Sequence, residues 1–150
     1  MILYHGGSEE IKYPEIKNIG YTKDFSWGFY CTNNYEQAKR WAKRKGRAIV
    51  NKYEYNENKQ LKIKIFNEPN NEWLEFVVAS RNGKKHDFDI VEGPMADDTI
   101  WNFINSYILK EINKEQFFVL MKFKHPTHQI SFHTKEALEC LKFIESEEIK

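Results

Sequence analysis

Three short stretches, far apart in the chain, each offer a side chain that could take part in chemistry. The first is Leu3-Tyr4-His5-Gly6-Gly7, in which a histidine ends a β-prone run. Glycines beside it let a ligand approach the backbone closely. An imidazole in that position can hydrogen-bond a sugar hydroxyl. A histidine at a strand end can equally be satisfied by a neighbouring carbonyl, and taken alone the residue favours that ordinary interpretation.

The second stretch, residues 24–32, carries an aromatic side chain, and the third, residues 129–134, carries an amide side chain. Tyr30 stands in the run Phe29–Thr32, after Gly28, and a ring that faces a cleft can stack on a flat heterocycle. Because side chains alternate along a strand, one of Phe29 and Tyr30 is expected in the core and the other elsewhere. Gln129 can donate and accept hydrogen bonds but cannot act as a base. The ordinary interpretations are a core tyrosine and a solvent-facing glutamine.

The charged candidates are weaker. Asp97 and Asp98 follow Gly93-Pro94, and at least one is expected to cap a helix. Arg81 could meet a phosphate, although a helix C-terminus favours a cation in any case. His128 and His133 should point to opposite faces of a strand, so we expect no metal site.

Composition limits the class of protein. The chain has 150 residues, 41% hydrophobic and 15% aromatic, with a net charge of +1. These values predict one domain, residues 1–150, with a true core and no global attraction to nucleic acid or membrane. Two cysteines without metal spacing indicate reduced thiols. With no signal-like start and no apolar run of about 18 residues, a cytoplasmic protein with no membrane partner is expected.

Periodicity and turn residues predict an α+β fold rather than a regular βαβ alternation. Residues 8–26 form a long irregular loop, a kind of loop that is often functional. Strands are expected at 1–4, 29–32, 48–55, 61–66, 88–91 (stopped by Gly93-Pro94) and 128–133. Helices are expected from Asn34 to Gly46, at 72–81, after Asp97 or Asp98, at 114–124, and from Thr134 through Leu138, Leu141 and Ile144.

Taken together, the stretches resemble the ADP-ribosyltransferase superfamily, and within it a family of small bacterial ADP-ribosyltransferase-like toxin domains. The first two also look like the polymerase-type branch, whose site is a His, a Tyr and a Glu on three strands. The resemblance implies split mixed and antiparallel sheets with flanking helices. The matching stretches are 3–6, 24–32 with Gln37-Ala38 and Trp41-Ala42, 89–98, and 129–134.

The resemblance also implies residue roles. His5 would bind the NAD ribose hydroxyls, the Gly6 backbone would pair with the nicotinamide carboxamide, and Tyr30 would stack on the nicotinamide ring. Arg81 is a further candidate for NAD binding. Gln129 is the candidate for the third position.

The sequence departs from the family pattern in two places. Ser26 stands where the relatives usually have glycine, and Gln129 replaces a glutamate. A glutamine can hold the ribose but cannot be a base, which argues against chain elongation and leaves single-unit transfer, NAD hydrolysis or no catalysis. Asp98 or Asp97 is the candidate for the missing carboxylate.

The expected function is therefore NAD-dependent mono-ADP-ribosyl transfer with release of nicotinamide, by the toxin of a bacterial toxin–antitoxin pair. NAD is the expected substrate and a small antitoxin the expected partner; the acceptor stays open between protein, nucleic acid and small molecule. One alternative is a nucleotide- or partner-binding domain without chemistry. Another is a metal-independent ribonuclease toxin that uses His5 with His133 or His128. A third is a structural or antitoxin-binding module whose aromatic-rich helices form the interface.

Overall fold

The computed structural model describes residues 1–17, 23–43, 46–124 and 126–150 of the chain. Its strands form two sheets, which together with the helices confirm the α+β class. The smaller sheet is antiparallel, in the order β1 (Ile2–Gly7), β3 (Ala48–Tyr55), β7 (Leu141–Ile149). The larger sheet has the order β2 (Phe29–Cys31), β6 (His128–Phe132), β5 (Ile90–Pro94), β4 (Ile63–Ile65), and only its β4–β5 pair is parallel.

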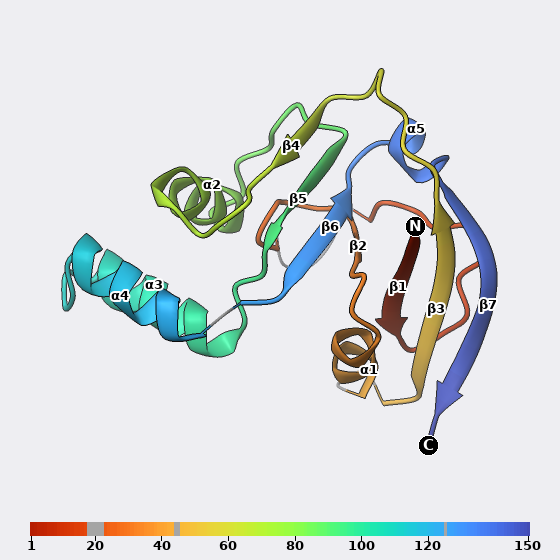
Figure 1. The fold of residues 1–150 in the computed structure, drawn as a ribbon, viewed down its shortest axis with the longest axis horizontal. Coiled ribbons are helices and arrows are strands. Elements are labelled where there is room, and N and C mark those ends of the chain that lie inside the picture. The colour runs from red at the N-terminus through yellow and green to blue at the C-terminus, as the bar shows by residue number, and fades with distance from the viewer. Residues whose placement is uncertain (18–22, 44–45, 125) are drawn as a thin grey trace.

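The helices cover different parts of the two sheets. Figure 1 shows α2 (Asn71–Arg81), α3 (Asp98–Ile108) and α4 (Lys114–Lys124) on one side of the larger sheet, with the smaller sheet on its other side. Helix α1 (Tyr35–Lys43) packs against β1 and β3, and the short α5 (Lys135–Leu138) connects β6 to β7. The larger sheet is therefore the middle layer.

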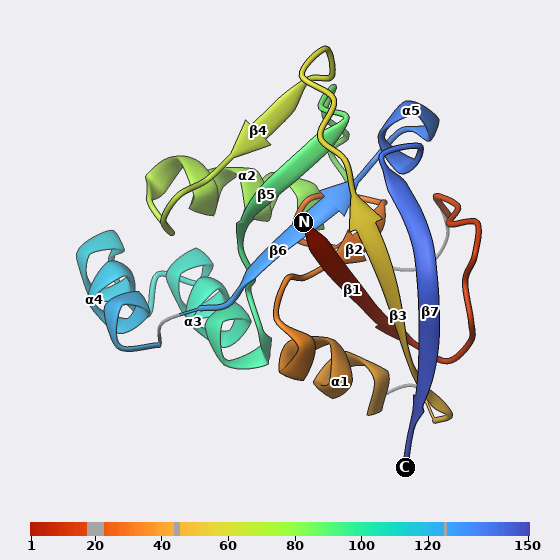
Figure 2. The ribbon, with the colours of Figure 1, turned by 45° about the vertical axis from the view of Figure 1, so that its right-hand side comes forward.

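Because of this position, the larger sheet is buried on both faces. Along β5, Ile90 packs towards the smaller sheet, in a cluster with Leu3 and Tyr53. Its neighbour Val91 packs towards the helices, in a cluster with Trp73 and Phe117. Successive side chains of a strand point to opposite faces, so the sequence alternates between two apolar cores rather than between core and solvent. Figure 2 shows β5 and β6 between the helices α2, α3 and α4 and the strands of the smaller sheet.

The two sheets meet where β1 passes β2. Tyr4 and Thr32 exchange both backbone hydrogen bonds, at 2.8 and 2.9 Å. Next to this bridge, a Cβ on Gly6 would lie 2.0 Å from the Ala38 carbonyl oxygen, so only glycine lets α1 pack this closely on β1. The bridge and the helix together fix the residue between them, His5, at the junction of the sheets.

Several predicted element boundaries are wrong. The first strand does not end at Tyr4 but includes Gly6 and Gly7, because both glycines pair with β3. The last helix ends at Leu138, and residues 141–149 form β7 instead of continuing it. The spacing of Leu141 and Ile144 fits a helix, but the backbone of this segment pairs with β3, far away in sequence. The fifth strand does not stop before Gly93-Pro94 but includes both. Proline can close a strand, because only its N–H is lost from the ladder.

The predicted bounds of β3 and α4 and the predicted start of α1 agree with the structure to within one residue. Strand β3 and helix α4 have the predicted bounds. The predicted start of α1 is one residue early, and Asn34 caps it by accepting the Gln37 backbone N–H at 3.0 Å. Within the described residues, none of the helices has both the length and the apolar character needed to cross a bilayer.

Candidate functional site

His5 is held in place by β2. Its Nδ1 lies 2.7 Å from the Tyr30 backbone oxygen, and its ring stacks on Phe29 with centroids 4.2 Å apart. A carbonyl oxygen only accepts, so Nδ1 donates, and in the neutral ring Nε2 is then an acceptor. The ordinary interpretation predicted a hydrogen bond from this histidine to a neighbouring carbonyl, and the Tyr30 backbone oxygen is that carbonyl.

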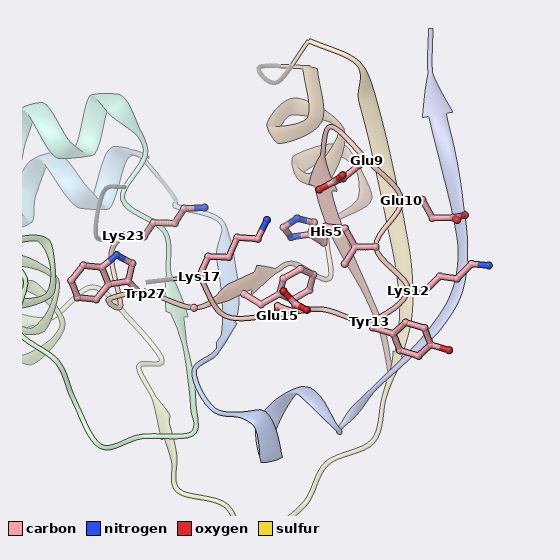
Figure 3. Close-up of a pocket in the computed structure, with 12 residues that line it drawn as sticks. His5, Glu9, Glu10, Lys12, Tyr13, Glu15, Lys17, Lys23 and Trp27 are labelled. Atoms are coloured by element: carbon pink, nitrogen blue, oxygen red, sulfur yellow. The ribbon is translucent and has the colours of Figure 1, made fainter. Parts of the chain in front are cut away.

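This histidine lies in the wall of a cavity of about 490 Å³, called here the first cavity (Figure 3). Its size is within the usual range for small-molecule sites, roughly 300–1,000 Å³. The lining comes from β1, the loop that follows it, and the turn before β2. The lining residues are His5, Glu9, Glu10, Ile11, Lys12, Tyr13, Glu15, Lys17, Lys23, Trp27, Gly28 and Phe29.

The loop wall of the first cavity is anchored to β3. The Asn51 side chain accepts from the Ile11 N–H at 2.9 Å and donates to the Glu9 carbonyl at 3.0 Å. The Tyr53 hydroxyl donates to the Ile11 carbonyl at 2.5 Å. Asn51 and Tyr53 are fully buried, so these bonds replace water for groups that folding removes from solvent. The loop carrying Glu9 therefore has a defined position.

Charged side chains in the wall of the first cavity point towards His5. In Figure 3, Glu9, Lys17 and Lys23 point towards His5, whereas Lys12 and Tyr13 point away from it. Sequence reasoning missed these residues individually. The signal that could have found them is the length and irregular composition of the segment 8–26, of which residues 18–22 lie outside the described part.

Tyr30 does not open onto the first cavity as the resemblance implies. It is 4% exposed, and its hydroxyl donates to the Ser26 carbonyl at 2.5 Å and accepts from the Phe25 N–H at 3.0 Å. Burial, and then the nearby Asp24 carboxylate, raise the pKa of this phenol well above its usual value. The Lys23 ammonium lies 5.1 Å from the ring centroid. One face of Tyr30 is therefore covered by a residue that itself lines the cavity.

The expected alternation of Phe29 and Tyr30 also takes a different form. Both rings are buried, Phe29 in the core between the sheets and Tyr30 in the core under the helices. The expectation that one of them points away from a core is wrong, because β2 belongs to the middle layer of the fold.

Gln129 and Arg81 are both engaged by a buried carboxylate, that of Asp24. Gln129 donates to Asp24 Oδ2 at 3.0 Å, and Arg81 donates to Oδ1 at 2.6 and 3.0 Å. The Ala96 N–H donates to Oδ2 at 2.8 Å, and the guanidinium also lies 4.5 Å from the centre of the Trp101 ring. Neither Gln129 nor Arg81 lines the first cavity. The solvent-facing interpretation of Gln129 is wrong, since it is 4% exposed.

Of Asp97 and Asp98, only the first caps helix α3. Asp97 caps α3 by accepting the Ile100 N–H at 2.8 Å. Asp98 is exposed in the first turn and is not part of the first cavity wall. Of the residues singled out by the sequence, the structure brings His5 to this cavity with the Tyr30 backbone beside it, and places Gln129, Arg81 and Asp98 elsewhere.

A second cavity, of about 310 Å³, lies against the same turn. Its lining contains two lysines and two histidines but no carboxylate. Trp27 lines both cavities, and residues 15–17 alternate between them: Glu15 and Lys17 line the first and Ile16 the second. The lining residues of the second cavity are Ile16, Ser26, Trp27, Lys85, His86, His133, Thr134 and Lys135.

His133 is a fixed, neutral part of the second cavity. Its Nδ1 donates to the Trp27 carbonyl at 2.7 Å, so Nε2 accepts from the Ser131 hydroxyl at 2.7 Å, a shorter contact than the 3.1 Å from that hydroxyl to the Val91 carbonyl. Burial lowers the pKa of His133 to about 4. Ser131 is fully buried, so the pair cannot present a nucleophile.

The histidine pair of the ribonuclease hypothesis is not assembled. His5 and His133 line different cavities, and His128 is exposed and lines neither. A general acid and a general base must both reach one substrate, so this arrangement gives the ribonuclease hypothesis no support.

The Trp27 indole lacks a hydrogen bond. Its Nε1–H is buried and has no acceptor among the described residues. A buried unpaired donor costs about 1–3 kcal/mol, and such groups in native structures call for an explanation. This unpaired donor belongs to the side chain that lines both cavities.

The comparisons with known proteins identify a family. Residues 1–143 match the family model described as "Protein of unknown function (DUF3990)", and the chain belongs to that family. A search of curated proteins found no significant match. A search of solved structures found none either. In the described part of the chain, no group of three or more His, Cys, Asp or Glu side chains could hold a metal ion.

Proposed function

We propose that this protein binds NAD in the first cavity and transfers its ADP-ribose to an acceptor, releasing nicotinamide. The observation that carries the proposal is the bond between His5 Nδ1 and the Tyr30 carbonyl, 2.7 Å long. It joins β1 of one sheet to β2 of the other in the wall of a ligand-sized cavity. The resemblance to ADP-ribosyltransferases implies split sheets with the histidine and the tyrosine on separate strands, and this bond joins two such strands.

The lining of the first cavity suits the parts of NAD. The acceptor nitrogen of His5 and the carboxylate of Glu9 can bind ribose hydroxyls, which are donors. Lys17 and Lys23 can neutralise the pyrophosphate. Glu9, with Glu15 across the loop, takes the place of the carboxylate that Asp98 or Asp97 was expected to supply. Gly6, Arg81 and Gln129 then support the structure instead of binding NAD.

Cleavage of NAD at the nicotinamide bond depends on positioning and on charge stabilisation more than on a strong nucleophile. The bond between ribose C1′ and the nicotinamide nitrogen breaks, and its electron pair leaves with nicotinamide. The positive charge that develops on the ribose is stabilised by the Glu9 carboxylate, already in place before the reaction. A lone pair of the acceptor then forms the new bond to C1′, and the acceptor loses its proton to water.

Tyr30 has a role in this proposal through the lysine that covers it. An aromatic face attracts cations, and here the cation is the Lys23 ammonium. The nicotinamide ring of NAD also carries a positive charge, so it can replace the ammonium over Tyr30 when Lys23 turns to the pyrophosphate. The buried phenol hydroxyl keeps its bonds to the Ser26 turn throughout.

A toxin role with a small antitoxin partner belongs to the same proposal. Support for a partner comes from α4, where Val119 and Phe123 are 53% and 78% exposed, one helical turn apart. Large apolar groups exposed together are typical of protein–protein contacts.

Binding without chemistry is the second candidate. It is favoured by Gln129, which stands where catalytic relatives have a glutamate and is engaged with Asp24. A protein of this kind would hold NAD or another nucleotide in the first cavity and leave it intact.

Nicotinamide release separates the two candidates. Purified protein is incubated with NAD, free nicotinamide is measured by chromatography, and NAD affinity is measured by calorimetry. The transferase proposal predicts release that falls at least about tenfold in His5→Ala and in Glu9→Gln, with His128→Ala, an exposed histidine outside both cavities, as the control. Binding with no release favours the second candidate, and absence of binding contradicts both.

A further inference from the structure

The two cavities share their walls but differ in charge. The first is lined by three glutamates and three lysines, besides His5. The second is lined by Lys85 and Lys135 on the chain segments before β5 and after β6, and by no acid. Two acids lie beside this lining without being part of it: Asp89, which accepts from the Thr134 hydroxyl at 2.7 Å and from the Lys62 N–H at 2.9 Å, and Asp87, whose charge acts on His86. The charged side chains in the lining itself are all positive.

Two flat rings line the second cavity together with these lysines. Trp27 and His86 line the second cavity, and the Lys85 ammonium lies 5.7 Å from the centre of the Trp27 ring system. Burial lowers the pKa of His86, which leaves it a neutral ring at pH 7. Cations that meet phosphates, combined with rings on which bases stack, are how proteins hold single-stranded nucleic acid. An acidic peptide would use the lysines but not the rings.

The size of the second cavity restricts the ligand further. At about 310 Å³ it is at the lower end of the range for ligand pockets. It can take one nucleoside but not a duplex, whose bases are stacked and paired. A base carried on a single strand can enter, with its flanking phosphates outside on Lys85 and Lys135, both exposed.

We infer that the second cavity binds a nucleotide of a single-stranded nucleic acid, and that this nucleotide is the acceptor of ADP-ribose. The acceptor part rests on the function proposed above. Among the described residues, Trp27 lines both cavities, and the loop at residues 15–17 contributes to the walls of both. An acceptor must approach C1′ to about 3–3.5 Å, and a neighbouring cavity allows this.

The transfer balances without a further reactant. A base nitrogen or oxygen attacks ribose C1′ of NAD, the bond to the nicotinamide nitrogen breaks, and neutral nicotinamide leaves with the electron pair. The acceptor atom loses one proton to solvent. The products are ADP-ribosylated nucleic acid, nicotinamide and a proton.

Two measurements test the inference on the intact chain. Binding of fluorescent 12-nucleotide single-stranded DNA and RNA is followed by anisotropy at low and moderate salt. The variant Lys85→Ala/Lys135→Ala is expected to weaken binding at least about tenfold and to reduce its salt dependence. The control is Lys59→Ala/Lys124→Ala, which removes two exposed lysines that line neither cavity. Oligonucleotide binding that is absent, or equal in the two double variants, overturns the inference.

The second measurement follows the label of ³²P-NAD into oligonucleotide, into poly-glutamate peptide and into total cell protein. Label in the oligonucleotide that is lost in Lys85→Ala/Lys135→Ala, with nicotinamide release in the absence of acceptor unchanged, supports the inference. Label in protein or peptide alone overturns it and leaves the transferase proposal standing. No nicotinamide release with any substrate overturns the proposed transferase and the acceptor assignment, while lysine-dependent oligonucleotide binding would still support the cavity as a nucleotide site.

Discussion

Gln129 donates a hydrogen bond to the buried carboxylate of Asp24, 3.0 Å away. Asp24 precedes β2, whereas Gln129 lies on β6, so the bond ties the turn before Tyr30 to the middle layer. Arg81 and the Ala96 N–H complete the set of donors around this carboxylate. An amide is required at position 129 because the acid beside it needs a donor.

Replacing Gln129 by glutamate should therefore harm the fold. In Gln129→Glu two carboxylates would face each other in a buried place, and we expect the free energy of unfolding at pH 7 to fall by about 3 kcal/mol. Urea denaturation measures it. Gln37→Glu is the matched control, because buried Gln37 lies 2.8 Å from the Arg40 guanidinium and a glutamate there keeps a cation partner. A Gln129→Glu protein that is fully stable and releases nicotinamide faster would restore Gln129 as a site residue.

A glycine at position 26 should stabilise the protein. Its φ is +77°, in the left-handed region. That conformation costs an L-residue about 1–2 kcal/mol, and the greater freedom of glycine in the unfolded chain returns about half of this. Ser26→Gly is therefore expected to stabilise the protein by about 0.5–1 kcal/mol in thermal and urea unfolding. Lys110, with φ +62°, is the matched position, and Lys110→Gly should behave alike. A loss of stability in Ser26→Gly alone would show that the serine side chain is needed.

Gly28 allows the turn before β2 to approach β6. A Cβ at this position would lie 2.7 Å from His133 Nδ1 and 2.8 Å from the Phe132 carbonyl oxygen. Gly28→Ala should lower the free energy of unfolding by at least about 2 kcal/mol, and it should disturb Trp27 and both cavities, seen as a shift in tryptophan fluorescence. In Gly7→Ala the new methyl group would meet, among the described residues, only the His5 ring, at 3.4 Å. This second variant should fold normally, and equal losses in both would contradict the account.

The pH dependence of stability should carry the signature of His133. Its pKa falls from about 6.5 in the unfolded chain to about 4 in the native protein, because burial disfavours the charged ring. The unfolded state thus binds more protons between these values, and stability is complete above pH 6.5 and falls as the pH drops towards 4. The full loss is on the order of 3 kcal/mol. His133→Gln, which can keep both hydrogen bonds, should flatten this slope to the smaller part due to His86. An unchanged slope in His133→Gln would contradict the assignment.

Local patterns were sufficient for elements whose character is set by their own residues. Strand β3 alternates around Tyr53 and Tyr55, and α4 lies between clear start and stop signals, so both have the predicted bounds. Strand β7 is different: it contains Glu145, Glu147 and Glu148, residues that are weak strand formers. Its strand character comes from pairing with β3, whose partner residues lie 86 to 101 positions earlier in the sequence, from Tyr55↔Leu141 to Ala48↔Ile149. A local period cannot contain that information.

The site residues show the same difference between what local sequence predicts and what depends on distant partners. His5 and the turn before Tyr30 could be identified from glycines and residue types, because those features are local. The burial of Gln129 and Arg81 depends on Asp24, 105 and 57 residues away in sequence. Glu9 becomes a cavity residue only because Asn51 and Tyr53 hold its loop. Such long-range partners decide which polar residues face a ligand and which support the core.

The most direct test is a crystal structure of the protein with a non-hydrolysable carba analogue of NAD, at a concentration where calorimetry shows saturation. We predict that the nicotinamide riboside half lies in the first cavity, with a ribose hydroxyl within hydrogen-bond distance of His5 Nε2 and of the Glu9 carboxylate. The Lys23 ammonium should have moved off the Tyr30 ring, which its present distance of 5.1 Å from the centroid makes easy to recognise. An analogue bound away from His5, or a first cavity that stays empty at saturation, would contradict the account.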